Sequence, residues 1–447
     1  MKKIKLLILG GGMYVCGRGT NTDGTIIPSL LLSDVQKKIN FCQILGNSNI
    51  GISQTRKKIN KILKENKNTI GFKYSKINRI DQVLKKTKFN CAIVCLPDNL
   101  HYKYIKILLN NKINVITVKP FVTNSNEALE LIKLAKDKKV ISQVDFHKRN
   151  DEANLMLKTL IEDNYFGNLI YSTVEYSQPK IIPEKLFKNW AMNTNVFQYL
   201  GIHYVDLISF LTNFKPISVY ASGVKNYLIT KKFKNYDSIH AIIDWKSQNN
   251  LIFKSIMNIN WIDPNNSNAF SDQRITIFGT EAKFKSDQTN RGISIYKDGG
   301  IQNPNPYFSG KYKLDNNTFY KGYGINVYKN FINDVYKKIN GIAVNNVGRA
   351  TFESSLDSVL VSEALLKSLE TDKKVIIEQP SKLKDYLKSL HAIKNLKKGS
   401  DINLKNFYLK SSYSGISIKQ IKKLRAKKIT TNIKKDELLD YSNIFDL

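Results

Sequence analysis

The chain has 447 residues, of which 42% are hydrophobic and 11% aromatic, so it is long enough for two or three domains and too apolar to be disordered. Its net charge of +33 comes almost entirely from lysines scattered along the sequence, and no basic patch is interleaved with stacking aromatic residues. We therefore attribute the charge to compositional bias, rank nucleic-acid binding last, and exclude a membrane span because no apolar run approaches about 18 residues.

The four cysteines, Cys16, Cys42, Cys91 and Cys95, all fall in the first quarter of the chain. Cys91 and Cys95 flank an apolar strand, and their spacing fits neither a zinc site nor a disulfide framework. Buried or free thiols are typical of a reducing compartment, so we expect a cytoplasmic protein. The N-terminal apolar run agrees with this, because it is too short for a signal peptide and has no cleavage site.

The first predicted element is an apolar strand over 4–9 that runs directly into three glycines. Glycines at a strand-to-helix turn let backbone N–H groups approach the pyrophosphate of a dinucleotide. The fingerprint G-x-G-x-x-G is incomplete, because Val15 occupies the place of the third small residue. A loop over 16–25 then delays the next apolar stretch, and we interpret it as an insertion beside the cofactor phosphates. The expected cofactor contacts here are Gly10, Gly11, Gly12, Met13, Tyr14 and Arg18.

A second strand over 41–45 ends in Gly46-Asn47, without the aspartate or glutamate that would bind the 2′-hydroxyl of the adenosine ribose. Arg56 and Lys57 follow shortly after, which leaves room for a 2′-phosphate. Asn47 is a candidate cofactor contact, and the choice between NAD and NADP stays open.

Three further apolar strands, over 91–96, 115–118 and 140–144, alternate with amphipathic helices. One of these helices begins at Asn124 with Glu127 three residues later, a spacing that resembles an N-terminal capping box. Repetition of strand and helix predicts an α/β Rossmann domain with a doubly wound parallel sheet over residues 1–148.

The strand over 115–118 ends at Lys119, and Pro120 cannot extend the ladder. Ligands of an open α/β sheet bind beyond the carboxyl ends of its strands, where this lysine is placed. A partly desolvated lysine titrates readily, which suits proton transfer. Taken alone, the pattern is better explained by an ordinary surface lysine on a turn. The motifs described next favour a catalytic lysine instead.

Four motifs follow one another in a fixed order: the glycine turn, Leu96-Pro97-x-x-x-His101, Val118-Lys119-Pro120 and Asp145-Phe146-His147-Lys148-Arg149. Their order and spacing resemble those of the Gfo/Idh/MocA oxidoreductases, the relatives of glucose-fructose oxidoreductase and inositol dehydrogenase. That family has Glu-Lys-Pro where this chain has Val118-Lys119-Pro120, so the lysine is present and its acidic neighbour is not. The resemblance implies cofactor contacts at Pro97, His101 and Lys119, and substrate contacts at Lys119 and Arg149.

After Arg149 the pattern changes to strands that mostly alternate apolar and polar side chains. Such alternation indicates a largely antiparallel sheet with one covered face. We expect an α+β substrate domain over 149–380, whose broad sheet makes a homo-oligomer plausible. Its predicted helices lie over 151–163, 323–339 and 352–369, and its predicted strands lie over 169–176, 217–224, 238–245, 251–259, 274–278, 281–285 and 373–377.

The segment 190–206, read as a helix, brings Tyr199, His203 and Asp206 to one face. His203 titrates near neutral pH and is the natural general acid or base, although a histidine on a helix is more often a satisfied core residue. The resembling family has Asp-x-Gly-x-His here, with the aspartate and the histidine facing the catalytic lysine. Gly201 and His203 match, and Tyr199 replaces the aspartate. The resemblance implies Lys119, His203 and Tyr199 as catalytic residues, and Trp190, Asn193 and His203 as substrate contacts.

The tail over 388–447 contains two similar stretches, 395–402 and 432–439, and such a repeat predicts a small pseudo-symmetric module. The region from about His391, with 406–410 and 414–417, resembles the antifreeze-like (SAF) domain at the C-terminus of sialic acid synthases. Those synthases have Arg-Pro where this chain has Ser411-Ser412, so the arginine that contacts sugar in them is missing. The alternative is a solvated, lysine-rich appendage.

These patterns predict an NAD(P)-dependent oxidoreductase that transfers a hydride between a nicotinamide and a hydroxyl-bearing carbon of a sugar, amino sugar or nucleotide sugar. By association, the tail suggests a pathway to nonulosonic acids or surface polysaccharides. The main alternative, motivated by Val118 and Tyr199, is a binding or regulatory subunit that holds the cofactor without redox turnover. A second alternative uses transient oxidation for elimination or glycoside cleavage. No metal, nucleic acid or membrane is expected to take part.

Overall fold

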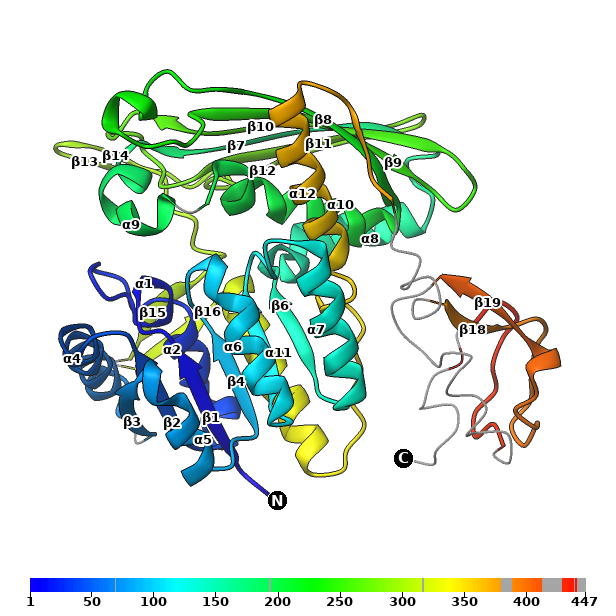
Figure 1. Ribbon diagram of the computed structural model, residues 1–447, viewed down its shortest axis with the longest axis horizontal. Helices are drawn as coiled ribbons and strands as arrows, with labels where there is room; N and C mark the ends of the chain where they lie inside the picture. The colour runs from blue at the N-terminus through cyan, green and yellow to red at the C-terminus, as the bar shows by residue number, and fades with distance from the viewer. Residues whose placement is uncertain are drawn as a thin grey trace. The chain divides into compact units, whose positions relative to one another are not determined.

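The computed structural model describes residues 1–68, 70–192, 194–315, 317–378, 388–411, 428–437 and 439. The chain forms two compact units, of which the larger comprises 1–336 and 348–377 and the smaller comprises 337–347 and 378–447. The larger unit contains two large sheets (Figure 1). The predicted domain boundary near residue 148 falls inside this unit, between the last strand of one sheet and the first strand of the other.

The first sheet has six strands, all parallel, in the order β3-β2-β1-β4-β5-β6. The predicted doubly wound parallel sheet is confirmed. The strand order reverses between β1 and β4, and open α/β sheets bind ligands outside such a switch point. The sequence missed β3 because this edge strand buries none of its side chains and so has no apolar run. The strands are β1 (Ile4–Leu9), β2 (Ile39–Gly46), β3 (Gly71–Lys76), β4 (Cys91–Val94), β5 (Asn114–Val118) and β6 (Ser142–Asp145).

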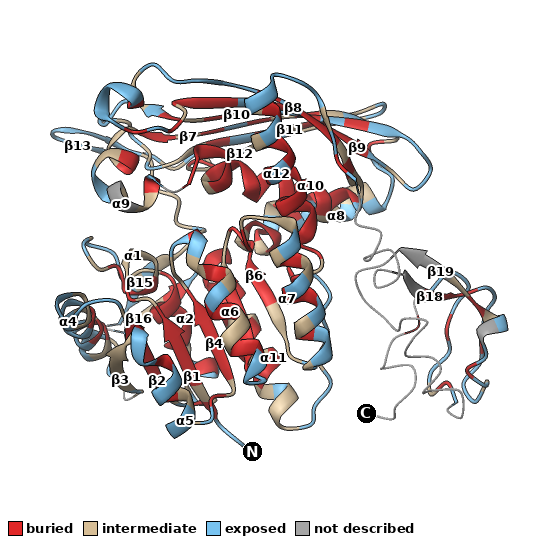
Figure 2. Ribbon diagram, in the orientation of Figure 1, coloured by how far each residue is buried: buried red, intermediate tan, exposed pale blue. Residues whose placement is uncertain are grey.

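Helices cover this first sheet, and its central strands β1, β4 and β5 are almost fully buried (Figure 2). The predicted start of α7 (Ser125–Asp137) is correct, because the Asn124 side chain accepts a hydrogen bond of 2.9 Å from the Glu127 N–H. Each longer helix buries one apolar face and exposes its lysines. The other helices are α1 (Met13–Cys16), α2 (Ile26–Leu30), α3 (Ser33–Gln36), α4 (Asn49–Glu65), α5 (Ile80–Lys86) and α6 (His101–Asn110).

The second sheet has seven strands in the order β12-β11-β7-β10-β9-β8-β17, and only the β7–β10 pair is parallel. This is the largely antiparallel sheet that the alternating pattern predicted. The strands are β7 (Leu169–Pro179), β8 (Lys215–Val224), β9 (Ser238–Lys246), β10 (Ile252–Asp263), β11 (Asp272–Gly279), β12 (Lys283–Asp287) and β17 (Val375–Ile376).

One face of the second sheet is covered by helices (Figure 1). Helix α12 packs against β8 and against α10, and nearly every residue of α10 is buried. Successive side chains of each strand point to opposite faces of the sheet, and those on the face without helices, such as Tyr220, Ile242 and Ile256, remain partly exposed. The helices of this region are α8 (Glu152–Glu162), α9 (Lys188–Ala191), α10 (Ile202–Thr212) and α12 (Leu356–Thr371). Helix α11 (Tyr323–Ile339) lies instead beside the first sheet, where the Tyr328 hydroxyl donates to Asp145 of β6 at 2.8 Å (Figure 1).

Two short hairpins between β12 and α11 were not predicted, because their sequences are polar and carry no sustained alternation. They are β13 (Ile295–Lys297) with β14 (Gly300–Gln302), and β15 (Gly310–Leu314) with β16 (Asn317–Lys321). The second hairpin reaches the inserted loop of the Rossmann domain. Lys311 Nζ lies 2.8 Å from an oxygen of Asp23 and 2.7 Å from one of Glu65, and the Tyr320 hydroxyl donates to Asp23 at 2.9 Å.

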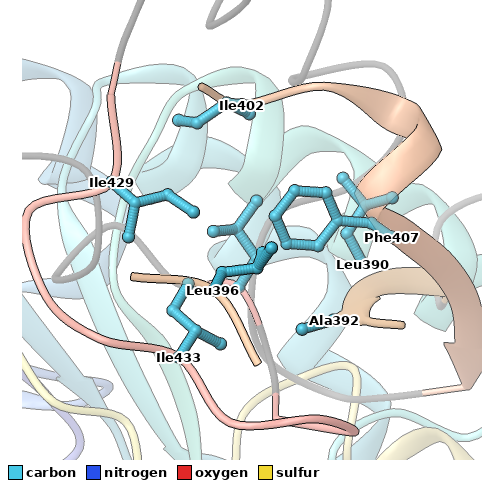
Figure 3. Packing of buried hydrophobic residues seen from close by; sticks show 8 residues of the cluster. Leu390, Ala392, Leu396, Ile402, Phe407, Ile429 and Ile433 are labelled. Carbon is cyan, nitrogen blue, oxygen red and sulfur yellow. The ribbon is translucent and has the colours of Figure 1, made fainter. Parts of the chain in front are cut away.

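The tail has its own apolar core, made by eight buried residues, most of which Figure 3 labels. They come from β18 (Lys388–Ala392), β19 (Phe407–Ser411) and the two repeat stretches, together with Ile429 just ahead of the second stretch. Leu396 and Ile433 occupy equivalent positions of the repeat and exchange two backbone hydrogen bonds of 2.8 and 2.9 Å. The repeat in the sequence therefore corresponds to a repeat in the backbone pairing. The core residues are Leu390, Ala392, Leu396, Ile402, Phe407, Ile429, Ile433 and Leu439.

The asparagine that begins each stretch accepts a backbone hydrogen bond from the other stretch. Asn395 Oδ1 accepts a bond of 2.7 Å from the Lys435 N–H, and Asn432 Oδ1 accepts one of 2.9 Å from the Lys398 N–H. Each stretch thus caps the turn of the other. The likeness to an SAF domain also depends on residues 412 and 414–417, which lie outside the described residues.

No helix in the described part of the chain is both long enough and apolar enough to cross a bilayer.

Candidate active site

A cavity of about 770 Å³ lies at the carboxyl ends of β1, β4, β5 and β6 and is closed by residues of the second sheet and its connections. Eight of the residues selected from the sequence line it. The two sides of the cavity come from parts of the chain that are distant in sequence, so the site exists only once both sheets have formed. The selected residues that line it are Gly12, Met13, Tyr14, Pro97, Lys119, Trp190, Tyr199 and His203.

The glycine turn keeps the space that a dinucleotide needs. Gly10 has a φ of +105°, and a Cβ there would lie 2.1 Å from the carbonyl oxygen of Cys95, so this close crossing of β1 and β4 requires glycine. Gly11 packs against Thr55 in the same way. At Gly12, by contrast, no atom lies within 4 Å of a Cβ position, and the backbone is open to the cavity. The turn therefore fits a pyrophosphate held by backbone N–H groups.

Arg18 and Asn47 lie beside the turn and not among the residues that line the cavity. Arg18 Nη1 donates to the carbonyl of Gly51 at 3.0 Å, in the first turn of α4. Asn47 is exposed just after β2. The pair thus sits at the end of the strand where the adenosine ribose of a dinucleotide is expected, and the arginine could meet an additional phosphate there.

Lys119 is placed at the end of β5 and reaches the second domain. Its Nζ donates to the Tyr199 carbonyl and lies 3.7 Å from the centre of the Tyr199 ring. Burial lowers the pKa of Lys119 from 10.5 to about 7, although the carboxylates of Asp98 and Asp145 oppose that shift. A lysine that titrates near neutral pH can exchange a proton under working conditions.

Tyr199 does not share a regular helical face with His203. It lies in a π-helical turn, η5 (Phe197–Gly201), and α10 begins only at Ile202. The phenol is enclosed by Trp190 and Trp261, at ring-centre distances of 4.7 and 5.7 Å, and burial raises its pKa well above 10. Tyr199 therefore supplies a neutral ring to Lys119, where the resembling family has a charged carboxylate.

His203 is 4% exposed and its Nδ1 has no hydrogen-bond partner in the described structure. Burial, reinforced by the positive charges of His147, Lys119 and Lys148, lowers its pKa well below 6.5. The imidazole is therefore neutral at pH 7, which is the form that can accept a proton. The sequence left two interpretations of His203 open, an acid–base residue or a core residue with satisfied hydrogen bonds. The absence of a hydrogen-bond partner for Nδ1 in the described structure favours the acid–base residue.

Two residues that sequence reasoning did not select complete this side of the cavity. The ring of His147 lies 4.5 Å from that of His203, and its Nδ1 lies 3.4 Å from Asp145 Oδ1. Both residues line the cavity. Their spacing of two, directly after a strand that ends at the ligand-binding edge, is a pattern that could have identified them.

Asp98 is a third residue that was missed. Its carboxylate is buried and accepts bonds from Trp190 Nε1 at 3.0 Å and from Thr194 Oγ1 at 2.9 Å. Asp98 follows β4, whereas Trp190 and Thr194 belong to the segment before α10. One carboxylate thus holds the two walls of the cavity together and fixes the indole that was expected to contact substrate.

Besides Arg18 and Asn47, four selected residues in the described part of the chain do not line the cavity. His101 is fully buried, and its ring nitrogens lie 2.8 Å from the carbonyl of Pro120 and 2.9 Å from that of Leu96, so it joins the two turns that carry Lys119 and Pro97. Arg149 forms a two-point ion pair with Asp206, at 2.8 and 2.6 Å, which occupies the guanidinium expected to bind substrate. Gly10 and Gly11 lie beneath the turn. Asn193 lies outside the described residues.

The lining of the cavity also includes a set of neutral polar groups. The buried Gln178 donates to Ser271 Oγ at 2.8 Å, while its Oε1 has no partner in the described structure. Lys119 is the one lysine or arginine among the described residues that line the cavity. Such a surface suits hydroxyl groups better than a phosphate or a carboxylate. The neutral polar residues are Gln178, Asn268, Ser271, Gln273, Thr289, Gln302, Asn303 and Asn305.

A search of the described residues finds no group of three or more histidine, cysteine, aspartate or glutamate side chains that could hold a metal ion.

Two sequence profiles of one oxidoreductase family match the chain. Residues 48–146 match its NAD-binding Rossmann fold, and residues 158–377 match its C-terminal alpha/beta domain. The N-terminal domain is therefore an NAD-binding Rossmann domain, which confirms the predicted nicotinamide cofactor.

Curated relatives match mainly in short segments. An uncharacterized oxidoreductase of Schizosaccharomyces pombe is 32% identical over 92 residues, which are 21% of this chain and 25% of that protein. Inositol 2-dehydrogenase of Rhodococcus jostii is 27% identical over 133 residues, 29% of this chain and 34% of that protein. The chain thus spans about a quarter to a third of the length of these relatives.

Solved structures share the fold over most of the chain. Scyllo-inositol dehydrogenase from Lactobacillus casei, crystallised with NAD(H) and scyllo-inositol, has a TM-score of 0.63 at 15% identity, over 84% of this chain and 99% of that one. GenD2 from gentamicin A biosynthesis, in complex with NAD, has a TM-score of 0.63 at 14% identity, over 85% of this chain and 97% of that one. At these identities, the similarity establishes the fold alone.

Proposed function

Because this chain belongs to the Gfo/Idh/MocA oxidoreductase family, we propose that it is an NAD(P)-dependent dehydrogenase that acts on a hydroxyl-bearing carbon of a neutral sugar or cyclitol. The observation that carries the proposal is the convergence of Lys119 and His203, from two different domains, on the cavity that the glycine turn also lines. When bound, the nicotinamide supplies the hydride acceptor or donor, and the protein supplies geometry and proton handling.

The residues divide the proton handling between them. In the oxidation direction, the neutral His203 accepts the proton of the substrate hydroxyl, because its imidazole is buried and uncharged. Lys119 donates a hydrogen bond to the same oxygen and, with its pKa of about 7, can adjust its own charge as the oxygen loses its proton. Tyr199 keeps Lys119 in place through its ring and its carbonyl.

The neutral polar residues that line the cavity support an uncharged substrate. A nucleotide sugar would bring a diphosphate, which is normally recognised by arginines or lysines. The described lining offers Lys119 alone, and the expected chemistry already uses it. We therefore prefer neutral sugars and cyclitols to nucleotide sugars among the substrates that the sequence left open.

NADP is a plausible alternative to NAD. No acidic side chain follows β2, and the Arg18 guanidinium lies at the first turn of α4 near that strand end. Both features favour a ribose that carries a 2′-phosphate over one with a free 2′-hydroxyl. Fluorescence titration with NADH and with NADPH measures this preference without any substrate.

The decisive experiment is an oxidation assay with a panel of neutral sugars, cyclitols, amino sugars and nucleotide sugars, using NAD⁺ and NADP⁺ in parallel and following the absorbance of the reduced nicotinamide. Cofactor reduction with a neutral polyol supports the proposal. Tight cofactor binding without turnover of any member would instead favour the redox-inactive binding subunit, for which Val118 and Tyr199 are the specific observations. Product formation without accumulation of reduced cofactor would favour transient oxidation.

We also propose a reducing, cytoplasmic location. All four cysteines are free thiols, and three of them are buried.

A further inference from the structure

The site lacks the two acidic residues of its family at positions 118 and 199, yet a different carboxylate lines the same cavity. We infer that His147, held by Asp145, is a second proton-carrying group of this site and receives the proton that His203 takes from the substrate hydroxyl. This inference rests on the proposed dehydrogenase function and assigns the part of the proton path beyond His203.

The carboxylate of Asp145 is fixed so that one oxygen faces His147. Oδ2 accepts hydrogen bonds from the hydroxyls of Tyr14 at 2.5 Å and Tyr328 at 2.8 Å. Oδ1 has no hydrogen-bond partner in the described structure and lies 3.4 Å from His147 Nδ1. A proton on that nitrogen would pair these two atoms. The arrangement is therefore ready to stabilise a positively charged His147.

The two imidazoles are close neighbours, and each has a ring nitrogen without a hydrogen-bond partner in the described structure. Their ring centres are 4.5 Å apart at an angle of 48°, and Nδ1 of each ring is buried without a partner in the described structure. Buried polar atoms are normally satisfied, so unpartnered atoms concentrated at one place indicate that something passes or binds there. At this separation, a proton can move between the rings through one water or after a small ring rotation.

Solvent access gives the path its direction. His203 is 4% exposed, whereas the side chain of His147 is 15% exposed. Oxidation breaks the C–H bond, whose electron pair leaves as hydride for the nicotinamide, and breaks the O–H bond, whose proton goes to His203. His203 passes the proton to His147, and His147 releases it to water. The overall reaction yields the ketone, the reduced cofactor and one proton, and reduction follows the same path in reverse.

The charges around the two rings favour this transfer. Buried, and close to Lys119 and Lys148, His203 is a poor place for a lasting positive charge. His147 has the Asp145 carboxylate beside it and the aromatic rings of Phe308 and Tyr323 at 4.8 and 5.7 Å. The titratable and charged groups that surround the pair are Lys119 beyond β5, Asp145 and Lys148 around β6, Asp206 on α10, and Tyr323 and Tyr328 on α11.

The test is His147→Gln in the full-length protein, assayed with whichever polyol the wild type oxidises. We expect kcat to fall about 100-fold, the typical contribution of a positioned proton carrier, with KM and NADH affinity unchanged. In His147→Ala, which leaves room for a free ring, added imidazole should restore part of the lost rate, which it could not do if the loss came from misfolding. A wild-type kcat in His147→Gln would overturn the inference. His240→Gln is the matched control, because His240 is exposed on β9 and lines no part of the cavity.

A second measurement needs neither substrate nor cofactor. The chain has five histidines, so their ring nitrogen signals can be assigned by NMR. Asp145→Asn keeps an acceptor for Tyr14 and Tyr328 but removes the charge that faces His147 Nδ1, and it should change the ring ¹⁵N chemical shifts of His147. Asp98→Asn, which changes another carboxylate of the cavity, should leave those chemical shifts in place. Unchanged His147 ring signals in Asp145→Asn would overturn the pairing.

The two measurements separate the inference from the proposed function. If the wild type oxidises a polyol and His147→Gln does so equally well, only the proton path is wrong. If the wild type oxidises nothing in the panel, the proposed function fails, and the NMR comparison of the variants alone then decides whether Asp145 and His147 interact as inferred.

Discussion

The Nζ atom of Lys119 lies 3.7 Å from the centre of the Tyr199 ring and donates to the carbonyl of the same residue. A cation over an aromatic face is held by the ring and not by the phenol oxygen. We therefore expect Tyr199→Phe to lose less than about tenfold in kcat, and Tyr199→Leu, which removes the ring, to lose clearly more. Steady-state kinetics of both variants checks this, and a severe loss in Tyr199→Phe would show that the hydroxyl itself takes part.

Lys119 and His203 should be needed for turnover and not for cofactor binding. Each contacts the cavity where the hydroxyl is expected, so Lys119→Met and His203→Gln should each reduce kcat by about 10²- to 10⁴-fold. NADH affinity, measured by fluorescence, should stay within about threefold of the wild type. A variant that keeps its turnover would remove that residue from the mechanism.

The buried Lys119 should make the protein more stable as the pH rises. Its pKa is lowered from 10.5 to about 7 in the folded state, so between those values the unfolded chain binds more protons than the folded chain. The free energy of unfolding then increases with pH, by up to about 1.4 kcal/mol per pH unit for one such group. Denaturant titrations at several pH values in this range should show that the free energy of unfolding of Lys119→Met rises less steeply with pH than that of the wild type.

The matched control for that measurement is Lys61→Met, since the Lys61 side chain is 72% exposed. The free energy of unfolding of this control should rise with pH as steeply as that of the wild type. The same dependence on pH in the wild type, Lys119→Met and Lys61→Met would show that Lys119 keeps an ordinary affinity for protons.

The Arg149–Asp206 pair should act on stability. Both side chains are buried, at 5% and 1% exposure, and removal of one partner leaves the other charge without compensation. We expect Asp206→Ala to lower the free energy of unfolding by about 3–5 kcal/mol. Glu162→Ala, which breaks the exposed pair with Lys158, should cost less than about 1 kcal/mol. If Asp206→Ala instead raised the substrate KM at unchanged stability, Arg149 would belong to the substrate site as the sequence suggested.

The outer face of the second sheet should mediate self-association. Ile242 on β9 is paired in register with Tyr220 on β8 and with Ile256 on β10, and all three side chains are partly exposed. An apolar ladder of this kind is self-complementary between two copies of the chain. Light scattering after size exclusion should find a homo-oligomer, and Ile242→Lys should weaken it. Ile295→Lys, on the separate hairpin, is the control, and a monomeric wild type would contradict the prediction.

The residues that could be predicted are those marked by local sequence. The glycine turn, the lysine that ends β5 and the histidine of α10 each sit in a short motif whose chemistry needs no knowledge of the rest of the chain. The fold class was predictable for the same reason, because strand and helix periodicities are local. The edge strand β3 and the polar hairpins gave no such pattern.

The residues that were missed depend on contacts between distant segments. Asp98 meets Thr194 across 96 positions of sequence, and His147 meets His203 only after the two domains have packed. Arg149 was assigned to substrate because it belongs to a motif of the family that the chain resembles, but its position is determined by the buried carboxylate of Asp206 on another element. The common face expected for Tyr199 and His203 was lost because the π-helical turn at Tyr199 changes the rotation per residue.

The paired turns of the tail have a practical consequence for how the chain can be shortened. Because Asn395 and Asn432 each cap a backbone turn of the other stretch, neither stretch retains its polar contacts without its counterpart. A truncation at 428 would uncover Leu390, Ala392 and Phe407 to water, whereas one ahead of 388 would remove the whole apolar cluster with no half left behind.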